Sequence, residues 1–534
     1  MIAADTVFGA FCDSAAHWSA RPFLNVLPET AEIYGIEAGE VTYADALTQV
    51  QDYRAQIDAA GYRKGQRVML LLENRPDYFI WWLALNALGI SVVPVNPDLR
   101  AAEQAYMIGH AEPVLAIAIA SRCDELREAA VQADSAMQVI ALGAALPIAA
   151  TDICIAAREG DPEAALLYTS GTTGSPKGCI LTNEYFLQAG RWYATATGIC
   201  ALNTDGERMI TPLPIFHMNA MAYSFMAMIA VGGCLTALDR FHPRTWWASV
   251  RASNATCLHY LGVMPSMLMG AAPNVDDTNH SVRFGFGAGI DPKLHAAFEA
   301  RFGFPVSEAW AMTETGAGGV ICANREPRVI GKSAIGAPDE AVEVLLVDEA
   351  GKDCDQGELL VRAAGDDPHK GFFAGYFKND AATNEAWQDG WFHTGDIVRR
   401  EGDGTMYFVD RKKNVIRRSG ENIAAVEVES ALSRHPAIAS VAVAAVPDAM
   451  RGDEVFACIV TKERTTPELA HQITEWCLTQ LAYYKAPGFI AFVDSLPVTA
   501  TQKLQRAKLK TLAQSLLADP NTVDTRHLKK RTAA

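Results

Sequence analysis

Residues 167–178 read LYTSGTTGSPKG, and their first two residues end the apolar run 164–168. The run is typical of a buried strand, and the segment that follows holds three glycines, five Ser or Thr hydroxyls and Lys177. Glycine lets the backbone approach a ligand closely, and hydroxyls, backbone N–H groups and a lysine bind phosphate oxygens. The segment therefore predicts a polyphosphate-binding loop, with a flexible linker as the alternative. It is not a GxxxxGK[ST] loop, because the lysine lies between Pro176 and Gly178.

Alternating helix and strand patterns surround this loop on its N-terminal side. Apolar spacing predicts helices over residues 44–59, 76–88 and 101–110, and strands over 68–72, 91–95 and 114–120. Strands that alternate with helices favour βαβ units in a largely parallel sheet.

A second pattern begins near residue 410, after the Gly- and Asp-rich stretch REGDGTMYFVDRKKN. It predicts helices over 423–434 and 467–481 and strands over 439–446, 455–461 and 488–493. About 120 residues of α+β pattern are enough for an independent small domain. We therefore expect an α/β fold with a large N-terminal domain of stacked βαβ-type subdomains, residues 1–409, and a small α+β C-terminal domain, residues 410–534.

Composition limits the class of protein. The chain has 534 residues, 50 % of them hydrophobic, and a formal net charge of −16. Such a chain has ample core and is neither disordered nor a small disulfide scaffold. The acidic balance argues against nucleic acid as a partner. The 11 cysteines form no CxxC pair, which favours reduced thiols and a cytoplasmic location.

Residues 209–238 contain no Asp, Glu, Lys or Arg, so this stretch is long enough and uncharged enough to be compared with a membrane-spanning helix. Two prolines, a histidine, an asparagine and a Gly-Gly pair interrupt it. We therefore expect a buried strand, a site-bearing loop and a core helix instead of a membrane span.

Five more segments follow the loop in order: Pro214-Ile-Phe-His217, Trp310-Ala-Met-Thr-Glu314, Trp391-Phe-His-Thr-Gly-Asp396, Asp410-Arg-Lys-Lys-Asn-Val-Ile-Arg-Arg-Ser-Gly420 and Leu496-Pro-Val-Thr-Ala-Thr-Gln-Lys503. In order and spacing, the six segments resemble the adenylate-forming (AMP-binding) enzyme superfamily. Within it the chain is similar to the acyl-CoA synthetases, and in particular to the carnitine/crotonobetaine-type and the medium-chain or aryl acid CoA ligases, between which the sequence does not decide.

The resemblance implies a two-step reaction that uses ATP, Mg²⁺ and coenzyme A. A carboxylic acid and ATP give an acyl-adenylate and pyrophosphate, and a thiol then displaces AMP to give the thioester. The small domain of such enzymes swings about a hinge, here Asp410, between a pose for each step. Two alternatives share the first step: an enzyme that loads a carrier-protein phosphopantetheine, and a luciferase-like oxygenase.

The resemblance also implies roles for individual residues. Phosphate-binding residues would be Thr169, Ser170, Gly171, Thr172, Thr173, Gly174 and Lys177. Thr313 would bind the α-phosphate and Glu314 the Mg²⁺, while Asp396 and Arg411 would bind the ribose. Gly287 and Ala288 would lie along the adenine. Lys503 would act as the catalytic lysine of the first step, and Gly420 would face the thiol tunnel of the second.

The acyl pocket of the family corresponds here to a mostly apolar set of residues. They are His217, Asn219, Tyr223, Val263, Met264, Trp310, Ala311, Met312, Gly316 and Val320. The chain departs from the family pattern at Trp310-Ala311, where Tyr-Gly is usual, and at Gln502, where Gly is usual. The first departure changes the expected pocket wall, so the acid stays open, as does the oligomeric state, for which a homodimer is one possibility.

Overall fold

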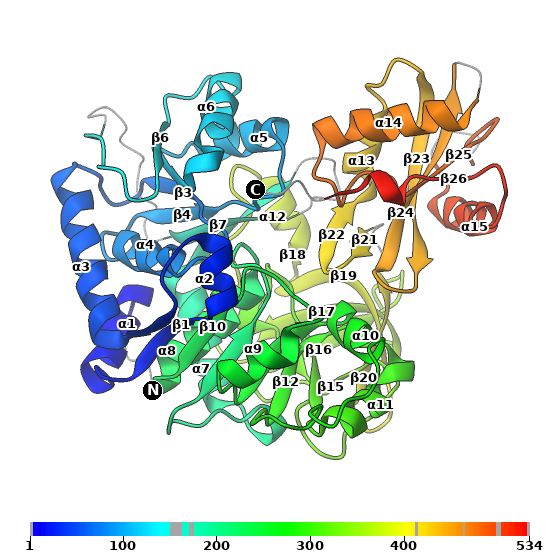
Figure 1. The fold of residues 1–534 in the computed structure, drawn as a ribbon. Coiled ribbons are helices and arrows are strands. Elements are labelled where there is room, and N and C mark those ends of the chain that lie inside the picture. The colour runs from blue at the N-terminus through cyan, green and yellow to red at the C-terminus, as the bar shows by residue number, and fades with distance from the viewer. Residues whose placement is uncertain are drawn as a thin grey trace.

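The computed structural model describes residues 4–149, 163–169, 176–411, 415–462, 465–497 and 504–530, without the side chains of Asp410, Arg411 and Ala507. The described strands form four sheets. Three use strands that end at or before residue 411, and the fourth uses only strands from residue 415 onward (Figure 1). The predicted α/β fold, with a large N-terminal part and a smaller C-terminal part, is confirmed.

The first sheet has the order β6-β5-β3-β4-β7-β8 and is parallel except for the β7–β8 pair. Its strands are β3 (Arg67–Leu71), β4 (Ser91–Pro94), β5 (Leu115–Ala118), β6 (Gln138–Ala141), β7 (Glu163–Thr169) and β8 (Lys177–Thr182). The helices of this part are α3 (Tyr43–Ala59), α4 (Pro76–Asn86), α5 (Ala101–Ala111), α6 (Cys123–Gln132) and α7 (Asn183–Thr195), with the 3-10 turn η1 (Ala120–Arg122). Each predicted helix and strand of this region is present.

The second sheet has the order β14-β13-β12-β11-β9-β10-β1-β2, with antiparallel pairs only at its two edges. Its strands are β1 (Pro22–Val26), β2 (Gly39–Thr42), β9 (Arg208–Thr211), β10 (Cys234–Ala237), β11 (Cys257–Leu261), β12 (Phe284–Ala288), β13 (Val306–Trp310) and β14 (Ile321–Cys322). Its helices and turns are α1 (Val7–His17), α2 (Pro28–Tyr34), η2 (Gly198–Cys200), the π-helical η3 (Asn219–Ser224), α8 (Phe225–Val231), α9 (Trp246–Ala252), α10 (Val263–Met269), α11 (Pro292–Phe302) and η4 (Gly316–Gly318).

The uncharged stretch 209–238 follows the prediction. It contains β9, a loop, η3, the short buried helix α8 and β10. In the part of the chain that the structure describes, no helix is both long and apolar enough to cross a bilayer.

The third sheet is antiparallel and was not predicted from the sequence. Its order is β15-β20-β19-β17-β16, and β18 pairs with β19. The strands are β15 (Ala334–Gly336), β16 (Val342–Val347), β17 (Gln356–Ala363), β18 (Trp387–Gln388), β19 (Trp391–Arg400) and β20 (Met406–Arg411), and α12 (Asp380–Ala386) precedes β18. The large N-terminal part is therefore not built of βαβ-type units alone.

The fourth sheet forms the small C-terminal part and agrees with the predicted α+β pattern. Its strands are β21 (Val415–Arg418), β22 (Glu421–Ala424), β23 (Ile438–Asp448), β24 (Gly452–Thr461), β25 (Phe489–Phe492) and β26 (Val523–Asp524). Its helices are α13 (Ala425–Leu432), α14 (Pro467–Gln480), α15 (Arg506–Leu516) and the 3-10 turn η5 (Arg526–Leu528). One continuous apolar cluster joins this part to the first sheet, because buried residues such as Leu71 and Met107 belong to the same cluster as Ile416 and Tyr484.

Candidate active site

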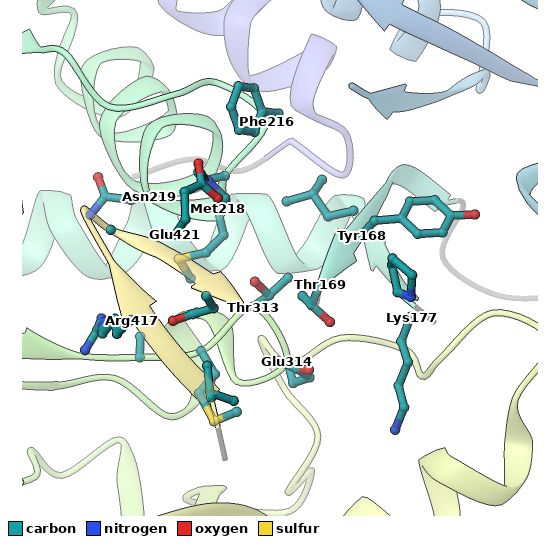
Figure 2. A pocket seen from close by; sticks show the side chains of 18 of the residues that line it. Tyr168, Thr169, Lys177, Phe216, Met218, Asn219, Thr313, Glu314, Arg417 and Glu421 are labelled. Carbon is teal, nitrogen blue, oxygen red and sulfur yellow. Dashed lines mark hydrogen bonds and ion pairs between the residues drawn. The ribbon is translucent and has the colours of Figure 1, made fainter. Parts of the chain in front are cut away.

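A cavity of about 630 Å³ lies where all four sheets contribute side chains (Figure 2). Several of its lining residues stand at the carboxyl ends of parallel strands: Thr169 ends β7, Leu261 ends β11 and Ala288 ends β12. In open parallel sheets, ligands bind at this edge. The cavity is therefore the candidate active site.

Most described residues that the sequence predicted for the site line this cavity. They are Thr169, Lys177, His217, Asn219, Tyr223, Gly287, Ala288, Ala311, Met312, Thr313, Glu314, Val320, Asp396 and Gly420. Ser170, Gly171, Thr172, Thr173, Gly174 and Lys503 lie outside the described residues, as does the side chain of Arg411. The backbone of Arg411 pairs with that of Asp396 across β19 and β20.

Four residues predicted for the acyl pocket do not line the cavity: Val263, Met264, Trp310 and Gly316. After Leu261 the chain turns into α10, which takes Val263 and Met264 away from the cavity. Gly316 lies behind Tyr223, whose hydroxyl donates to the Gly316 carbonyl at 3.0 Å. Trp310 faces Asp396 instead of an acyl chain, as described below.

Glu314 is held firmly at the cavity wall. Its side chain is buried, and the Tyr376 hydroxyl donates to Glu314 Oε1 at 2.8 Å. Tyr185 fixes the neighbouring residue by donating to the Thr313 carbonyl at 2.9 Å. Lys177 Nζ lies 4.5 Å from the centre of the Tyr376 ring. A carboxylate and an ammonium group therefore share this wall, next to the end of β7.

Asp396 is almost completely buried yet lines the cavity. The Trp310 indole Nε1–H donates to Asp396 Oδ2 at 2.9 Å, and the Asp396 backbone N–H donates to Thr394 Oγ1 at 3.0 Å. A hydrogen bond from an indole holds the carboxylate in one orientation. Trp310 therefore acts on the site through Asp396.

The same cavity includes a backbone surface without side chains, at the end of β12. A Cβ at Gly287 would come within 2.2 Å of the Tyr260 carbonyl oxygen, so no side chain fits there. Glu308 fixes the following turn, since it accepts from the backbone N–H groups of Gly289 and Ile290 at 2.8 and 3.1 Å. The bare strand end suits a planar group such as a base.

The wall formed by residues 213–223, Phe286 and 309–320 carries almost no charge. Its cavity-lining members are Leu213, Pro214, Phe216, His217, Met218, Asn219, Tyr223, Phe286, Ala309, Ala311, Met312, Thr313, Glu314 and Val320. Glu314 belongs to the wall that it shares with Lys177, as described above. We call the other members of this set the acyl wall. Asn219 Oδ1 lies 2.7 Å from His259 Nδ1, and burial lowers the pKa of His259 to about 3, so this partner is neutral. Asn219 begins the π-helical turn η3, which places Asn219 and Tyr223 on the same side.

The small C-terminal part closes the cavity with its β21–β22 hairpin, which contributes Arg417, Gly420 and Glu421 (Figure 2). Glu421 Oε1 lies 3.4 Å from His217 Nε2. Gly420 has φ = +91°, and a Cβ there would lie 2.3 Å from Leu261 Cδ1. The hairpin thus packs directly on the end of β11, and the positive φ at position 420 favours glycine there.

Comparison with known proteins agrees with this geometry. The model of the family described as "AMP-binding enzyme" matches residues 20–377, and that described as "AMP-binding enzyme C-terminal domain" matches residues 427–503. The chain belongs to the AMP-binding enzyme family. A crotonobetaine/carnitine–CoA ligase from Salmonella arizonae is 30 % identical to this AMP-binding enzyme over 90 % of the chain and 96 % of the relative. The predicted superfamily is therefore confirmed.

Solved structures of two states of one protein resemble this AMP-binding enzyme to different degrees. The o-succinylbenzoate CoA synthetase from Bacillus subtilis bound with the product analogue OSB-NCoA gives a TM-score of 0.77, at 24 % identity over 94 % of this chain and 97 % of that chain. The complex of that synthetase with the acyl-adenylate OSB-AMP gives 0.63, at 25 % identity over the same shares. The first of these structures is of a double mutant of the synthetase, and both matches show the same fold along nearly the whole chain.

The residues present suit a nucleotide and a magnesium ion. Mg²⁺ prefers oxygen ligands and takes one or two protein carboxylates together with phosphate oxygens. Glu314 supplies one such carboxylate, and the described residues contain no group of three or more His, Cys, Asp or Glu able to hold a metal by themselves. The site therefore fits a metal that arrives with phosphates, and the oriented Asp396 carboxylate fits a ribose diol.

The Trp310–Asp396 contact leads to a first prediction. Trp310→Phe keeps an aromatic ring but removes the N–H that orients Asp396. Since a hydrogen bond to a charged group contributes about 1.5–3 kcal/mol, we expect KM for ATP to rise roughly tenfold or more, with a smaller change in KM for the acid. Steady-state kinetics with each substrate varied in turn measures this difference. A change in the KM for the acid alone would instead assign Trp310 to the acyl pocket.

Proposed function

We propose that this AMP-binding enzyme is an ATP-dependent carboxylic acid–CoA ligase. It forms an acyl-adenylate with release of pyrophosphate, and a thioester with release of AMP. The observation that carries the proposal is the shared cavity, in which the carboxylates of Glu314 and Asp396 face the same space as the Gly420 hairpin. The same cavity can therefore hold a nucleotide and a second reactant that the hairpin of the small domain helps to position. CoA ligases among the relatives and the solved structures support the same reaction.

The residue roles follow from the chemistry of the donors. The first step joins a carboxylate to a phosphate, so neutralising and positioning two anions is the main task. We assign Lys177 and the segment that begins at Thr169 to the β- and γ-phosphates, Thr313 to the α-phosphate, and Glu314 to Mg²⁺. Bound Mg²⁺ would draw negative charge away from the phosphate oxygens.

The remaining assignments concern the nucleoside, the acid and the thiol. Asp396 and Arg411 bind the ribose, and Gly287 and Ala288 lie along the adenine. Lys503 bridges the acid and the α-phosphate in the first step. In the second step, the Gly420 hairpin guides the thiol of coenzyme A.

The acyl wall supports an acid without a second charge. Its two titratable residues are His217 and Tyr223, burial raises the pKa of the Tyr223 phenol so that it is neutral, and Asn219 faces a neutral histidine. A buried charge needs a partner of opposite sign; the acyl wall's own residues offer none to a quaternary ammonium or a second carboxylate, and Glu421 of the hairpin, which also lines the cavity, already lies 3.4 Å from His217 Nε2. We therefore propose a neutral aliphatic or aromatic acyl group, in contrast to the betaine-type acids named for the relatives.

A screen of pyrophosphate release over short, medium, aryl, betaine-type and dicarboxylic acids tests both proposals. We expect release of AMP and pyrophosphate with a neutral acid, and an acyl-CoA product only when CoA is present. Formation of ADP would contradict the ligase. Preference for a betaine-type acid would contradict only the neutral acyl group, and transfer to a phosphopantetheinyl carrier protein but not to CoA would favour the carrier-loading alternative.

We also propose that the chain divides at Asp410 into domains 1–409 and 410–534, hereafter the large and the small domain. The division is supported by the fourth sheet, which contains no strand that begins before residue 415. A cytoplasmic location is supported by ten free cysteines among the described residues. A homodimer stays a prediction that light scattering can test.

A further inference from the structure

A second contact between the two domains is a buried cluster of three charged side chains, which we call the latch. It consists of Glu103 on α5, Glu427 on α13 and Lys485 after α14. Lys485 Nζ lies 2.6 Å from Glu103 Oε1 and 2.7 Å from Glu427 Oε1. The three side chains are only 6–8 % exposed. The helix that carries Glu103 lies beside α14 of the small domain (Figure 1).

The large domain contributes one carboxylate to the latch, and the small domain contributes a donor to each of its two oxygens. Glu103 Oε2 accepts from the Ala482 backbone N–H at 2.8 Å, so both of its oxygens contact the small domain. The same oxygen accepts from the Arg100 N–H at 3.0 Å, which caps α5. Beside the latch, Asn96 Nδ2 donates to the Tyr484 hydroxyl at 3.1 Å.

The charges of the latch depend on one another. Burial alone would lower the pKa of Lys485, but the carboxylates of Glu103 and Glu427 raise it above its ordinary value, so Lys485 is charged. The Lys485–Glu427 pair lies wholly within the small domain and remains when that domain moves. Within the latch, only the Glu103 contacts join the two domains. A buried charge pair adds little net stability but strongly favours one geometry over another.

We propose that Glu103 is a positioning residue for the second half-reaction. By binding Lys485 and Ala482 it holds the small domain in the pose that places the Gly420 hairpin in the cavity. Adenylate formation uses the other pose and does not require this contact. Because the Glu103 contact is polar, water can replace it when the domain swings back, so the latch can open in every turnover. The inference rests on the proposed ligase function.

The test compares Glu103→Gln with Glu112→Gln. Glutamine at position 103 still caps α5 but lacks the charge that pairs with Lys485. Glu112, at the other end of α5, pairs with Lys378 on the surface of the large domain, so its variant loses an ion pair without loosening the latch. For Glu103→Gln we expect thioester formation from synthetic acyl-adenylate to slow about tenfold, because a tenfold smaller population of the pose that places the Gly420 hairpin in the cavity lowers the rate by the same factor. Pyrophosphate release should stay at the wild-type rate or rise, and Glu112→Gln should change neither step. Equal losses in both half-reactions, or none in either, would overturn the proposal.

A double-mutant cycle with Lys485→Met guards against a general folding defect. Coupling between positions 103 and 485 should appear in the thioester step and be absent from adenylate formation.

A second readout does not depend on catalysis. Spin labels at Val131 on α6 and Met450 after β23, which are 80 % and 60 % exposed, report the distance between the domains. Glu103→Gln should broaden or shift this distance, and an unchanged distribution would contradict the latch. Failure of the ligase function would instead show as no acyl-CoA from the wild-type enzyme with any acid.

Discussion

Lys503→Ala is expected to lower adenylate formation by ~100- to 1,000-fold, as loss of one group that stabilises developing charge does. Thioester formation from a supplied acyl-adenylate should stay largely intact. The reason is that only the first step brings a carboxylate against a phosphate and needs a cation between them. In the arrangement described here, the described residues around Lys503 lie away from the cavity, as we expect if Lys503 acts only in the pose for the first step. Leu496 and Leu504 pack on the small domain's own core, and no described residue after Lys485 lines the cavity.

Two assays and one control decide the outcome. Pyrophosphate release from acid and ATP measures the first step, and acyl-CoA formation from synthetic acyl-adenylate measures the second. Lys508→Ala serves as the control, because Lys508 is an exposed lysine of α15. If Lys503→Ala lost both steps equally, the assignment of the two steps to two domain poses would be wrong.

Gly420→Val is expected to have the opposite effect, a normal rate of pyrophosphate release and a thioester yield lowered by ~100-fold. The backbone φ of +91° disfavours any side chain, and a Cβ would overlap Leu261 Cδ1 at 2.3 Å. The substitution therefore keeps the hairpin out of the cavity. A clash of about 3 kcal/mol is enough for a 100-fold change in rate.

Two further variants separate this clash from backbone strain. Gly404→Val places a side chain at φ = +84°, where no atom lies within 4 Å, and should leave both steps unchanged. Leu261→Ala removes the overlapping atom. Combined with Gly420→Val, it should therefore restore part of the lost thioester yield. An unaltered thioester yield for Gly420→Val would show that the hairpin is not used in the second step.

Local sequence signals predicted much of the fold and of the large-domain side of the site. Apolar spacing located most of the central helices and strands of the first and fourth sheets, because each of these elements buries one face or one run of residues, but it missed elements such as β6, β8, β21 and α15. The resemblance to the AMP-binding family pointed to Thr313, Glu314, Asp396 and His217, and all four line one cavity. The third sheet was missed, because its antiparallel strands lack the helix–strand alternation that revealed the first.

The contacts between distant segments could not be predicted from the sequence. Tyr376 reaches Glu314, 62 residues away in the chain, and Lys485 reaches Glu103 across 382 residues. No periodicity or motif links such positions, because the fold alone brings them together. The role of Trp310 was missed for a related reason. A tryptophan in an acyl-pocket motif suggests a wall, and only the position of Asp396 reveals the use of its N–H group.

The apolar cluster that joins the small domain to the first sheet has a consequence for heat denaturation. Domains that meet only through polar contacts can melt one at a time. Here, separating the two domains exposes buried aliphatic and aromatic side chains such as Met107 and Tyr484 to water, at a free-energy cost proportional to the apolar area. In this pose the small domain therefore draws part of its thermal stability from the large one. A ligand that selects the other pose makes the melting of the two domains less cooperative.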